Sequence, residues 1–255
     1  MHPELFRIGD FTISTYGLMM ALAFLTGLWI LKKEFLRLKI PIEAVDMIFW
    51  RAAIGGIIGA RIYYVILTKI SGSPEPILNL IFSRSGMVFF GGLLGGAMLV
   101  LHGVRKNKYP LKTILDAIAP VMIVAYGIGR IGCFFAGCCY GYETALSWGI
   151  TFSDPMCAAP TGVALHPTQL YETLASFVIF GVLWCFRKRI SFRGGLFAIY
   201  LAFAGLERFL IEFFRQKDDY LTQNPDFTMA QLIGLGLIVL GVYLFLIWKK
   251  LPSDS

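Results

Sequence analysis

The chain has 255 residues, of which 57% are hydrophobic and only 15% are charged, and its formal net charge is +7 at pH 7. A soluble domain is about 45–50% apolar and about 25% charged, so this composition excludes an ordinary soluble protein and indicates an integral membrane protein. Five cysteines are too few for a disulfide scaffold, and we expect no cleavable signal peptide at the start, MHPELFRIGDF.

Seven apolar stretches follow one another along the chain. A membrane-spanning helix needs about 20 mostly apolar residues, and each stretch meets this requirement, some of them with internal charges. We therefore expect an all-α integral membrane protein with seven transmembrane helices, organised as a single polytopic domain over residues 1–255. The predicted helices are 14–31, 44–67, 86–104, 114–136, 168–186, 194–214 and 228–248.

Basic residues gather on one predicted side of the membrane. The segments after the first, third, fifth and seventh helices carry 14 Lys and Arg residues, whereas the opposite side carries five, among them Arg84 and Lys217. The positive-inside rule then places the N-terminus outside and the C-terminus in the cytoplasm. This alternation accounts for the net charge without a nucleic-acid partner.

Four arginines lie inside the predicted helices, where a charge costs about 2.5–3.5 kcal/mol on insertion scales. They are Arg51, Arg61, Arg130 and Arg208. Each should therefore face protein, water or a bound anion. One alternative is a set of buried ion pairs with the acidic residues of the helices, which are Asp46, Asp116, Glu172, Glu207 and Glu212. The other is a clamp in which three guanidinium groups hold a phosphate.

A long loop follows Arg130. The segment 137–165 has 29 residues and contains neither Lys nor Arg, which suits an extracytoplasmic position. Long loops in compact folds are often functional. We therefore expect the candidate site at the outer leaflet, where it would hold an anionic headgroup.

Six short motifs in chain order resemble one family. They are YGLMMALAF at 16–24, GARIYYV at 59–65, GGLLGG at 91–96, GRIGCFFAG at 129–137, HPTQLYE at 166–172 and ERFLIEFFRQKD at 207–218. Together the chain resembles the prolipoprotein diacylglyceryl transferase family. This resemblance implies transfer of a diacylglyceryl group from phosphatidylglycerol to the cysteine thiol of a secreted prolipoprotein, in the bacterial inner membrane and without a cofactor.

The resemblance also assigns site residues. Tyr16, Arg61 and Gly141 match family positions expected to bind substrate. Arg130 and Arg208 match arginines expected to hold and neutralise the phosphate.

The chain departs from the family pattern at several polar positions. Phe90 stands where the family has histidine, and Ala204 aligns with a family tyrosine. In the signature, Cys133 and Ala136 replace two asparagines, and Cys138 replaces a glutamate. The resemblance therefore implies that the phosphate-binding arginines are retained. It also implies that the family's usual base is absent and that the active site is altered.

The thiols are candidates for the missing chemistry. Because a nearby cation such as Arg130 lowers a thiol pKa, Cys138 and Cys139 are predicted to be catalytic, as nucleophiles or as a redox pair. Cys133 is predicted to line the substrate site beside them. The alternative is that all three are small apolar fillers.

Other candidates surround the thiols. His166 is predicted to act as a base or to orient a partner, unless it only belongs to a helix start. Glu172 is predicted to line the substrate site and to brace arginines. Cys157 is open to pairing with Cys138 or Cys139. Zinc would need four ligands, for which the thiols and His166 are available, but their spacing matches no known finger and we expect no metal.

Three functions remain open. The first is the family reaction, with phosphatidylglycerol and a secreted precursor as partners. The second is a divergent paralogue that uses the same phospholipid cradle for other thiol, acyl or alkyl transfer or redox chemistry. The third is a non-catalytic lipid-binding or transport protein.

Overall fold

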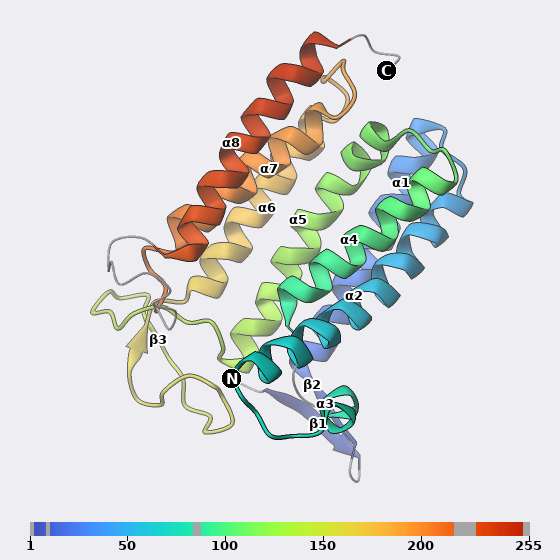
Figure 1. Ribbon diagram of the computed structural model, residues 1–255. Coiled ribbons are helices and arrows are strands. Elements are labelled where there is room, and N and C mark those ends of the chain that lie inside the picture. The colour runs from blue at the N-terminus through green and yellow to red at the C-terminus, as the bar shows by residue number, and fades with distance from the viewer. Residues whose placement is uncertain (1–2, 9–10, 84–87, 217–227, 252–255) are drawn as a thin grey trace. The chain divides into compact units, whose positions relative to one another are not determined.

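The structure is a computed structural model that describes residues 3–8, 11–83, 88–216 and 228–251 (Figure 1). The described chain is mostly helical, as the composition predicts, and it also contains two small two-stranded sheets. It forms two compact units, Lys32–Ile114 and the combination of Met1–Leu31 with Leu115–Ser255. The predicted single domain stays a prediction.

The unit Lys32–Ile114 is built around a close helix pair. Figure 1 shows α2 (Glu43–Ile70) beside α4 (Phe89–Lys106), with the short α3 (Ile77–Phe82) between them in sequence. A side-chain carbon on Gly95 would lie 2.8 Å from the Cα atom of Gly59. Glycines at the crossing therefore let the two backbones approach closely, which is a common way to pair helices in lipid.

The other unit begins with a hairpin and a helix. Strands β1 (Glu4–Ile8) and β2 (Phe11–Ser14) pair antiparallel and lead into α1 (Thr15–Leu38). The first part of α1 packs on α5 (Leu111–Ala136). A side-chain carbon on Gly132 would lie 3.1 Å from Cβ of Met19, so this glycine sets the close approach of the two helices.

Three further helices complete this unit: α6 (Thr168–Phe186), α7 (Gly195–Ile211) and α8 (Met229–Lys250). Thr228 and Gln231 form a capping box that starts α8. Asp116 of α5 was a predicted ion-pair partner for an arginine. Its carboxylate accepts hydrogen bonds from the backbone N–H groups of Gly194, at 2.6 Å, and Phe197, at 2.9 Å. A negative charge there also suits the positive end of the α7 dipole.

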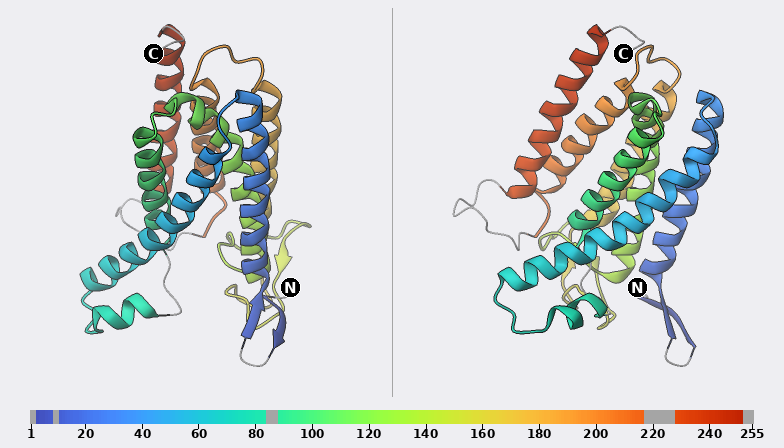
Figure 2. Two further views of the ribbon diagram at one scale, coloured as in Figure 1. Left: turned by 90° about the vertical axis from the view of Figure 1, so that its right-hand side faces the viewer. Right: turned by 45° about the vertical axis from the view of Figure 1, so that its right-hand side comes forward.

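The predicted outer loop is folded rather than extended. Strands β3 (Ile150–Thr151) and β4 (Ala164–Leu165) pair antiparallel within it. Phe152, Cys157 and Leu165 are buried together in a small core. In both views of Figure 2, this segment lies at the end of the unit where α5 stops and α6 starts.

All seven predicted helices exist, but their number as membrane spans stays a prediction. Five described helices are long and apolar enough to cross a membrane, namely α1, α2, α5, α6 and α8. Helix α7 has only 17 residues, and the 18-residue α4 ends in Arg105 and Lys106. The chain is therefore a multi-pass helical membrane protein whose two small sheets the all-α prediction missed.

Several basic residues expected in loops lie in helices. Helix α1 continues to Leu38 and includes three of them, so the connection to α2 is shorter than predicted. Long basic side chains at helix ends can reach the membrane surface from within the helix. The orientation predicted from the positive-inside rule is therefore unchanged. Arg84, Lys217 and Asp218 lie outside the described residues.

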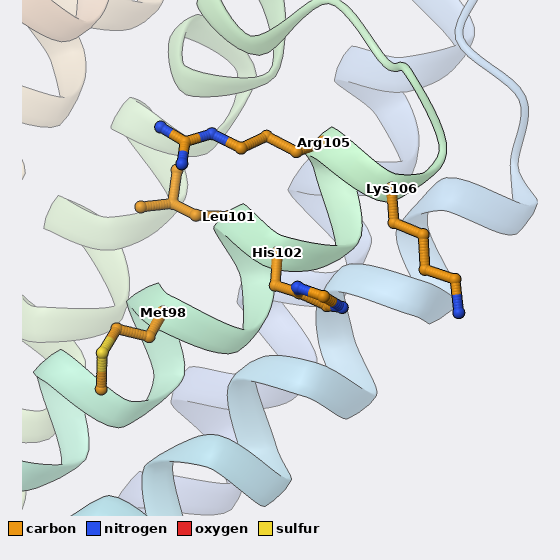
Figure 3. Close-up of a pocket in the computed structure, with 5 residues that line it drawn as sticks. All are labelled: Met98, Leu101, His102, Arg105 and Lys106. Carbon is orange, nitrogen blue, oxygen red and sulfur yellow. The ribbon is translucent and has the colours of Figure 1, made fainter.

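A pocket lies on the basic end of α4. It is lined by Met98, Leu101, His102, Arg105 and Lys106 (Figure 3). No residue predicted for the candidate site lines this pocket, so it is not the catalytic candidate.

Candidate functional site

Glu172 of α6 is the centre of a buried ionic cluster. Its side chain is 1% exposed, and its Oε2 atom accepts a hydrogen bond from Nε of Arg130 at 2.5 Å. Tyr126 donates its hydroxyl to Oε1 at 3.0 Å. Tyr126 and Arg130 lie four residues apart and therefore share one face of α5. The predicted bracing of an arginine by Glu172 is confirmed.

Two more arginines approach the same carboxylate. Nη1 of Arg208 lies 3.7 Å from Oε1 of Glu172, and Nη1 of Arg215 lies 3.8 Å from it. Arg208 also pairs with Glu212 at 2.9 Å, one turn further along the chain. The predicted ion pairs are therefore present for Arg130 and Arg208, whereas the phosphate clamp stays a prediction.

The cluster carries excess positive charge. Three guanidinium groups contact two carboxylates, so one positive charge is not balanced within the cluster. The side chain of Arg130 is 11% exposed, whereas those of Arg208 and Arg215 are 29% and 23% exposed. Arg208 and Arg215 therefore keep donors available to a ligand such as a phosphate.

Backbone pairing brings Arg215 to the site. Gly141 forms an isolated bridge with Arg215, and the N–H of Tyr142 donates to the carbonyl of Phe214 at 3.0 Å. A side-chain carbon on Gly141 would lie 2.7 Å from Cβ of His166. Gly141 thus permits the close approach of three segments, and its predicted contact with substrate stays a prediction.

Cys133, Cys138 and Cys139, here called the thiol cluster, meet at the end of α5. Gly137 adopts φ +69°, its N–H donates to Phe134, and the N–H of Cys138 donates to Cys133, both at 3.1 Å. This is a Schellman motif, which reverses the chain after the helix. The turn returns Cys138 to Cys133, and the three Sγ atoms lie within 4.8 Å of one another.

Charge and hydrogen bonds differ among the thiols. Nη1 of Arg130 donates to Sγ of Cys133 at 3.5 Å. Hydrogen bonds from the neighbouring thiols, with Arg130 and Arg215, lower the pKa of Cys139. Hydrogen bonding with Cys133 and Cys139 raises the pKa of Cys138.

Buried side chains of α6 hold the cluster's backbone. Thr168 donates to the carbonyl of Cys139 at 2.7 Å, and Gln169 donates to that of Cys138 at 2.6 Å. Both side chains belong to residues with no exposed surface. Cys139 has φ +61°, an unusual value for a residue with a side chain, and these bonds help to hold it there.

His166 belongs to an aromatic group beside the thiol cluster. Its Nδ1 atom lies 3.1 Å from the hydroxyl of Tyr171, which also accepts a hydrogen bond from Trp148 at 2.9 Å. Its ring packs on Phe214, with 5.4 Å between centroids. The predicted role of His166, as a base or as an orienting residue, stays a prediction.

Cys157 is free, as are the other four cysteines, all of which lie in the described chain. Its thiol points to the carbonyl of Phe135 at 3.9 Å, inside the core of the outer loop. The suggested disulfide with Cys138 or Cys139 is therefore not formed in this structure.

Two predicted binding residues have different surroundings. Tyr16 is 43% exposed and lies against α5, where a side-chain carbon on Gly132 would be 3.2 Å from its ring. Arg61 belongs to the unit Lys32–Ile114. It donates to the carbonyl of Ser83 at 2.8 Å and to that of Leu80 at 3.3 Å, so it holds the end of α3.

Sequence reasoning missed two members of the ionic cluster. Tyr126 lies one helical turn before Arg130, a spacing that predicts a shared face. Arg215 lies in the quoted 207–218 motif but beyond the apolar run, so it was counted as a loop charge. Its position depends on pairing with Gly141, which the sequence alone does not reveal.

Comparisons with known proteins agree with the sequence motifs. The family model described as prolipoprotein diacylglyceryl transferase matches residues 3–247. A phosphatidylglycerol–prolipoprotein diacylglyceryl transferase of Clostridium tetani is 35% identical over 251 residues, covering 96% of this chain and 97% of the relative. Its Geobacter sulfurreducens counterpart is 35% identical, covering 94% and 92%. That of Chlorobaculum tepidum is 33% identical, covering 100% and 92%.

Proposed function

The chain belongs to the prolipoprotein diacylglyceryl transferase family, and from this premise we propose that it moves a diacylglyceryl group from phosphatidylglycerol to a prolipoprotein cysteine. The membership makes the chain a transferase of lipoprotein biosynthesis. The proposal adds that its arginines hold the phosphate, and that it works in the bacterial inner membrane on secreted precursors.

The arrangement of arginines around Glu172 carries this proposal. Attack of a thiolate on the diacylglyceryl carbon breaks a carbon–oxygen bond and leaves glycerol phosphate with one more negative charge. Arg208 and Arg215 present exposed guanidinium groups beside Arg130, where this charge would develop. Donors fixed before the reaction stabilise such charge without reorganisation. Tyr16 would position the rest of the lipid.

The thiol cluster is proposed to handle the acceptor's proton. Phe90 occupies the position of the family histidine and has no basic group. The ring of His166 is engaged by Tyr171 and Phe214, whereas Cys133 directly contacts Arg130. The thiol cluster therefore contacts one of the arginines around Glu172 directly, whereas the ring of His166 contacts aromatic residues.

A lipidation assay tests the proposal. The purified chain, reconstituted in phosphatidylglycerol vesicles with a peptide that contains an acceptor cysteine, should yield a thioether and glycerol phosphate. Replacement of Arg208 or Arg215 by alanine should lower turnover by about 10²-fold or more, as expected for loss of a charge-stabilising donor. Arg105→Ala, in the last turn of α4, is the matched control. Absence of product, or full activity without both arginines, contradicts the proposal.

The thiol cluster also favours a second candidate, a paralogue with different thiol chemistry. Complementation separates the two functions. If the chain is well expressed but does not rescue depletion of an ordinary transferase, the second candidate is favoured. Phosphatidylglycerol binding without any turnover would instead favour a non-catalytic lipid-binding protein.

A further inference from the structure

We propose that Cys133, Cys138 and Cys139 bind one zinc ion, and that its open fourth position receives the thiolate of the acceptor cysteine. The first part stands on the geometry of the thiol cluster alone. The second part rests on the proposed function, because it assigns the ion a role in the same transfer.

The distances within the thiol cluster suit a metal. Zinc binds thiolate sulfur at about 2.3 Å, and tetrahedral geometry then places two sulfurs about 3.8 Å apart. The three Sγ atoms already lie within 4.8 Å of one another. The largest of these separations therefore exceeds the tetrahedral value by about 1 Å at most.

The sequence favoured no metal because its cysteine spacing matches no known finger. The Schellman turn removes that objection, since it folds Cys138 back onto Cys133 across Gly137. Thr168 and Gln169 then fix the carbonyls of the adjacent cysteines from a fully buried position. Such outer contacts orient metal ligands and hold them in place before the ion arrives.

The charges around the thiol cluster fit three bound thiolates. Zinc with three thiolates carries one net negative charge, opposite in sign to the excess charge of the ionic cluster, and Arg130 of that cluster contacts Cys133 at 3.5 Å. If the thiols stayed protonated and neutral, the positive charge of the nearby arginines would repel a Zn²⁺ ion. Metal binding releases the thiol protons, however, and thereby reverses the sign of the group.

The fourth position is open. Among the described residues, the group of side chains that could jointly hold an ion contains the three cysteines and no fourth member. His166, which the sequence offered as a fourth ligand, directs Nδ1 to Tyr171 instead. Three protein ligands with one open position are typical of catalytic rather than structural zinc.

The open position gives the thiol cluster a means to ionise the acceptor thiol, which is the step that the proposed function assigns to it. On coordination the acceptor thiol loses its proton to water and becomes a zinc-bound thiolate. The sulfur then forms a bond to the diacylglyceryl carbon as the carbon–oxygen bond breaks, and glycerol phosphate leaves with the electron pair. The product thioether is uncharged and binds zinc weakly, so it departs.

Metal analysis of the whole chain tests the site. Protein purified in detergent under reducing conditions, loaded with Zn²⁺ and passed over a desalting column, should retain about one zinc per chain. Loading with Co²⁺ should give sulfur-to-cobalt charge-transfer bands. Cys138→Ser and Cys139→Ser should each weaken zinc binding by at least 10-fold. Cys157→Ser and Cys185→Ser, which remove cysteines outside the cluster, should bind as the unmodified chain does.

The cobalt bands keep the test decisive if a cluster variant fails to fold, because their intensity in the unmodified chain reports the number of bound thiolates. Absence of charge-transfer bands, or retention of zinc by folded Cys138→Ser and Cys139→Ser chains, overturns the site. A disulfide within the cluster under these reducing conditions also overturns it.

The role in transfer has a separate readout. Removal of zinc with a chelator should lower lipidation at least 10-fold, and added Zn²⁺ should restore it. Full activity of the zinc-free chain overturns the metal's role and leaves the transferase intact. A chain that binds zinc but transfers no lipid, with or without it, instead contradicts the proposed function and leaves the metal site standing.

Discussion

At the scale of single residues, one carboxylate organises the site. Glu172 is nearly inaccessible to solvent and faces Arg130, Arg208 and Arg215. A buried charge is tolerated only when it is paired, so each partner depends on the other. The three arginines are therefore held in place by a residue that exposes almost no surface of its own.

Glu172→Gln should destabilise the protein strongly. The change leaves Arg130 largely buried without its ionic partner, and breaking such a pair typically costs about 3–5 kcal/mol. Thermal unfolding in detergent should show a large decrease in Tm. Glu143→Gln, at an exposed position in the outer loop, should change stability by less than about 0.5 kcal/mol. Similar Tm values for the two variants would contradict the central role of Glu172.

Cys157 should resist alkylation at neutral pH. Burial, and secondarily the charge of Asp154, raises the pKa of its thiol. Because the thiolate is the reactive form and a raised pKa keeps it protonated, reaction should become appreciable only above the usual thiol pKa of about 8.5. Mass spectrometry after iodoacetamide treatment at pH 7 and pH 9.5 would measure this. In denatured protein the same thiol should react at lower pH, and equal pH profiles would refute the prediction.

At the scale of elements, turns and glycine contacts determine what the helices bring together. The apolar runs predicted where the helices lie, since hydrophobic length needs no tertiary information. The sequence predicted the three cysteines beside one another, but it could not establish the reversal at Gly137 that brings their Sγ atoms together, because that reversal depends on the folded chain. Arg215 was missed for the same reason, since a single backbone pairing with Gly141 positions it.

Gly137→Ala should disturb both the fold and the thiol cluster. Its φ of +69° costs a residue with a side chain about 1–2 kcal/mol, and the new carbon would lie 2.7 Å from Cβ of Cys157. Gly162→Ala is a matched control. Its φ is +81°, but no atom lies within 4 Å of the added carbon, so it carries the backbone strain without a clash. Tm and lipidation should decrease more for Gly137→Ala, and an equal or reversed order would contradict this reasoning.

Two glycines of α8 offer a comparison within one helix. A side-chain carbon on Gly234 would lie 2.8 Å from the carbonyl oxygen of Gly205 in α7, whereas one on Gly236 meets nothing within 4 Å. Gly234→Ala should therefore separate α7 from α8 and lower Tm. Gly236→Ala should be neutral or stabilising by up to about 1 kcal/mol, because alanine favours helix. A Gly234→Ala chain as stable as Gly236→Ala would show that this contact does not hold the pair.

At the scale of the whole molecule, charge and hydropathy describe the same membrane protein. The six motifs predicted the family, and the family comparison confirms it over residues 3–247. Orientation in the membrane depends instead on where the basic residues lie, and it is open to direct test.

The C-terminus should lie in the cytoplasm and the loop 137–165 outside. Lys and Arg are retained on the cytoplasmic side, 14 residues lie on the predicted inner side, and the loop itself has none. A green fluorescent protein fused to the complete chain should therefore fluoresce, because it folds in the cytoplasm. An epitope inserted after Ala145, an exposed position of the loop, should bind antibody on intact spheroplasts. The opposite pair of results would place the thiol cluster on the cytoplasmic side, where secreted precursors could not present a translocated cysteine, and would exclude the proposed reaction.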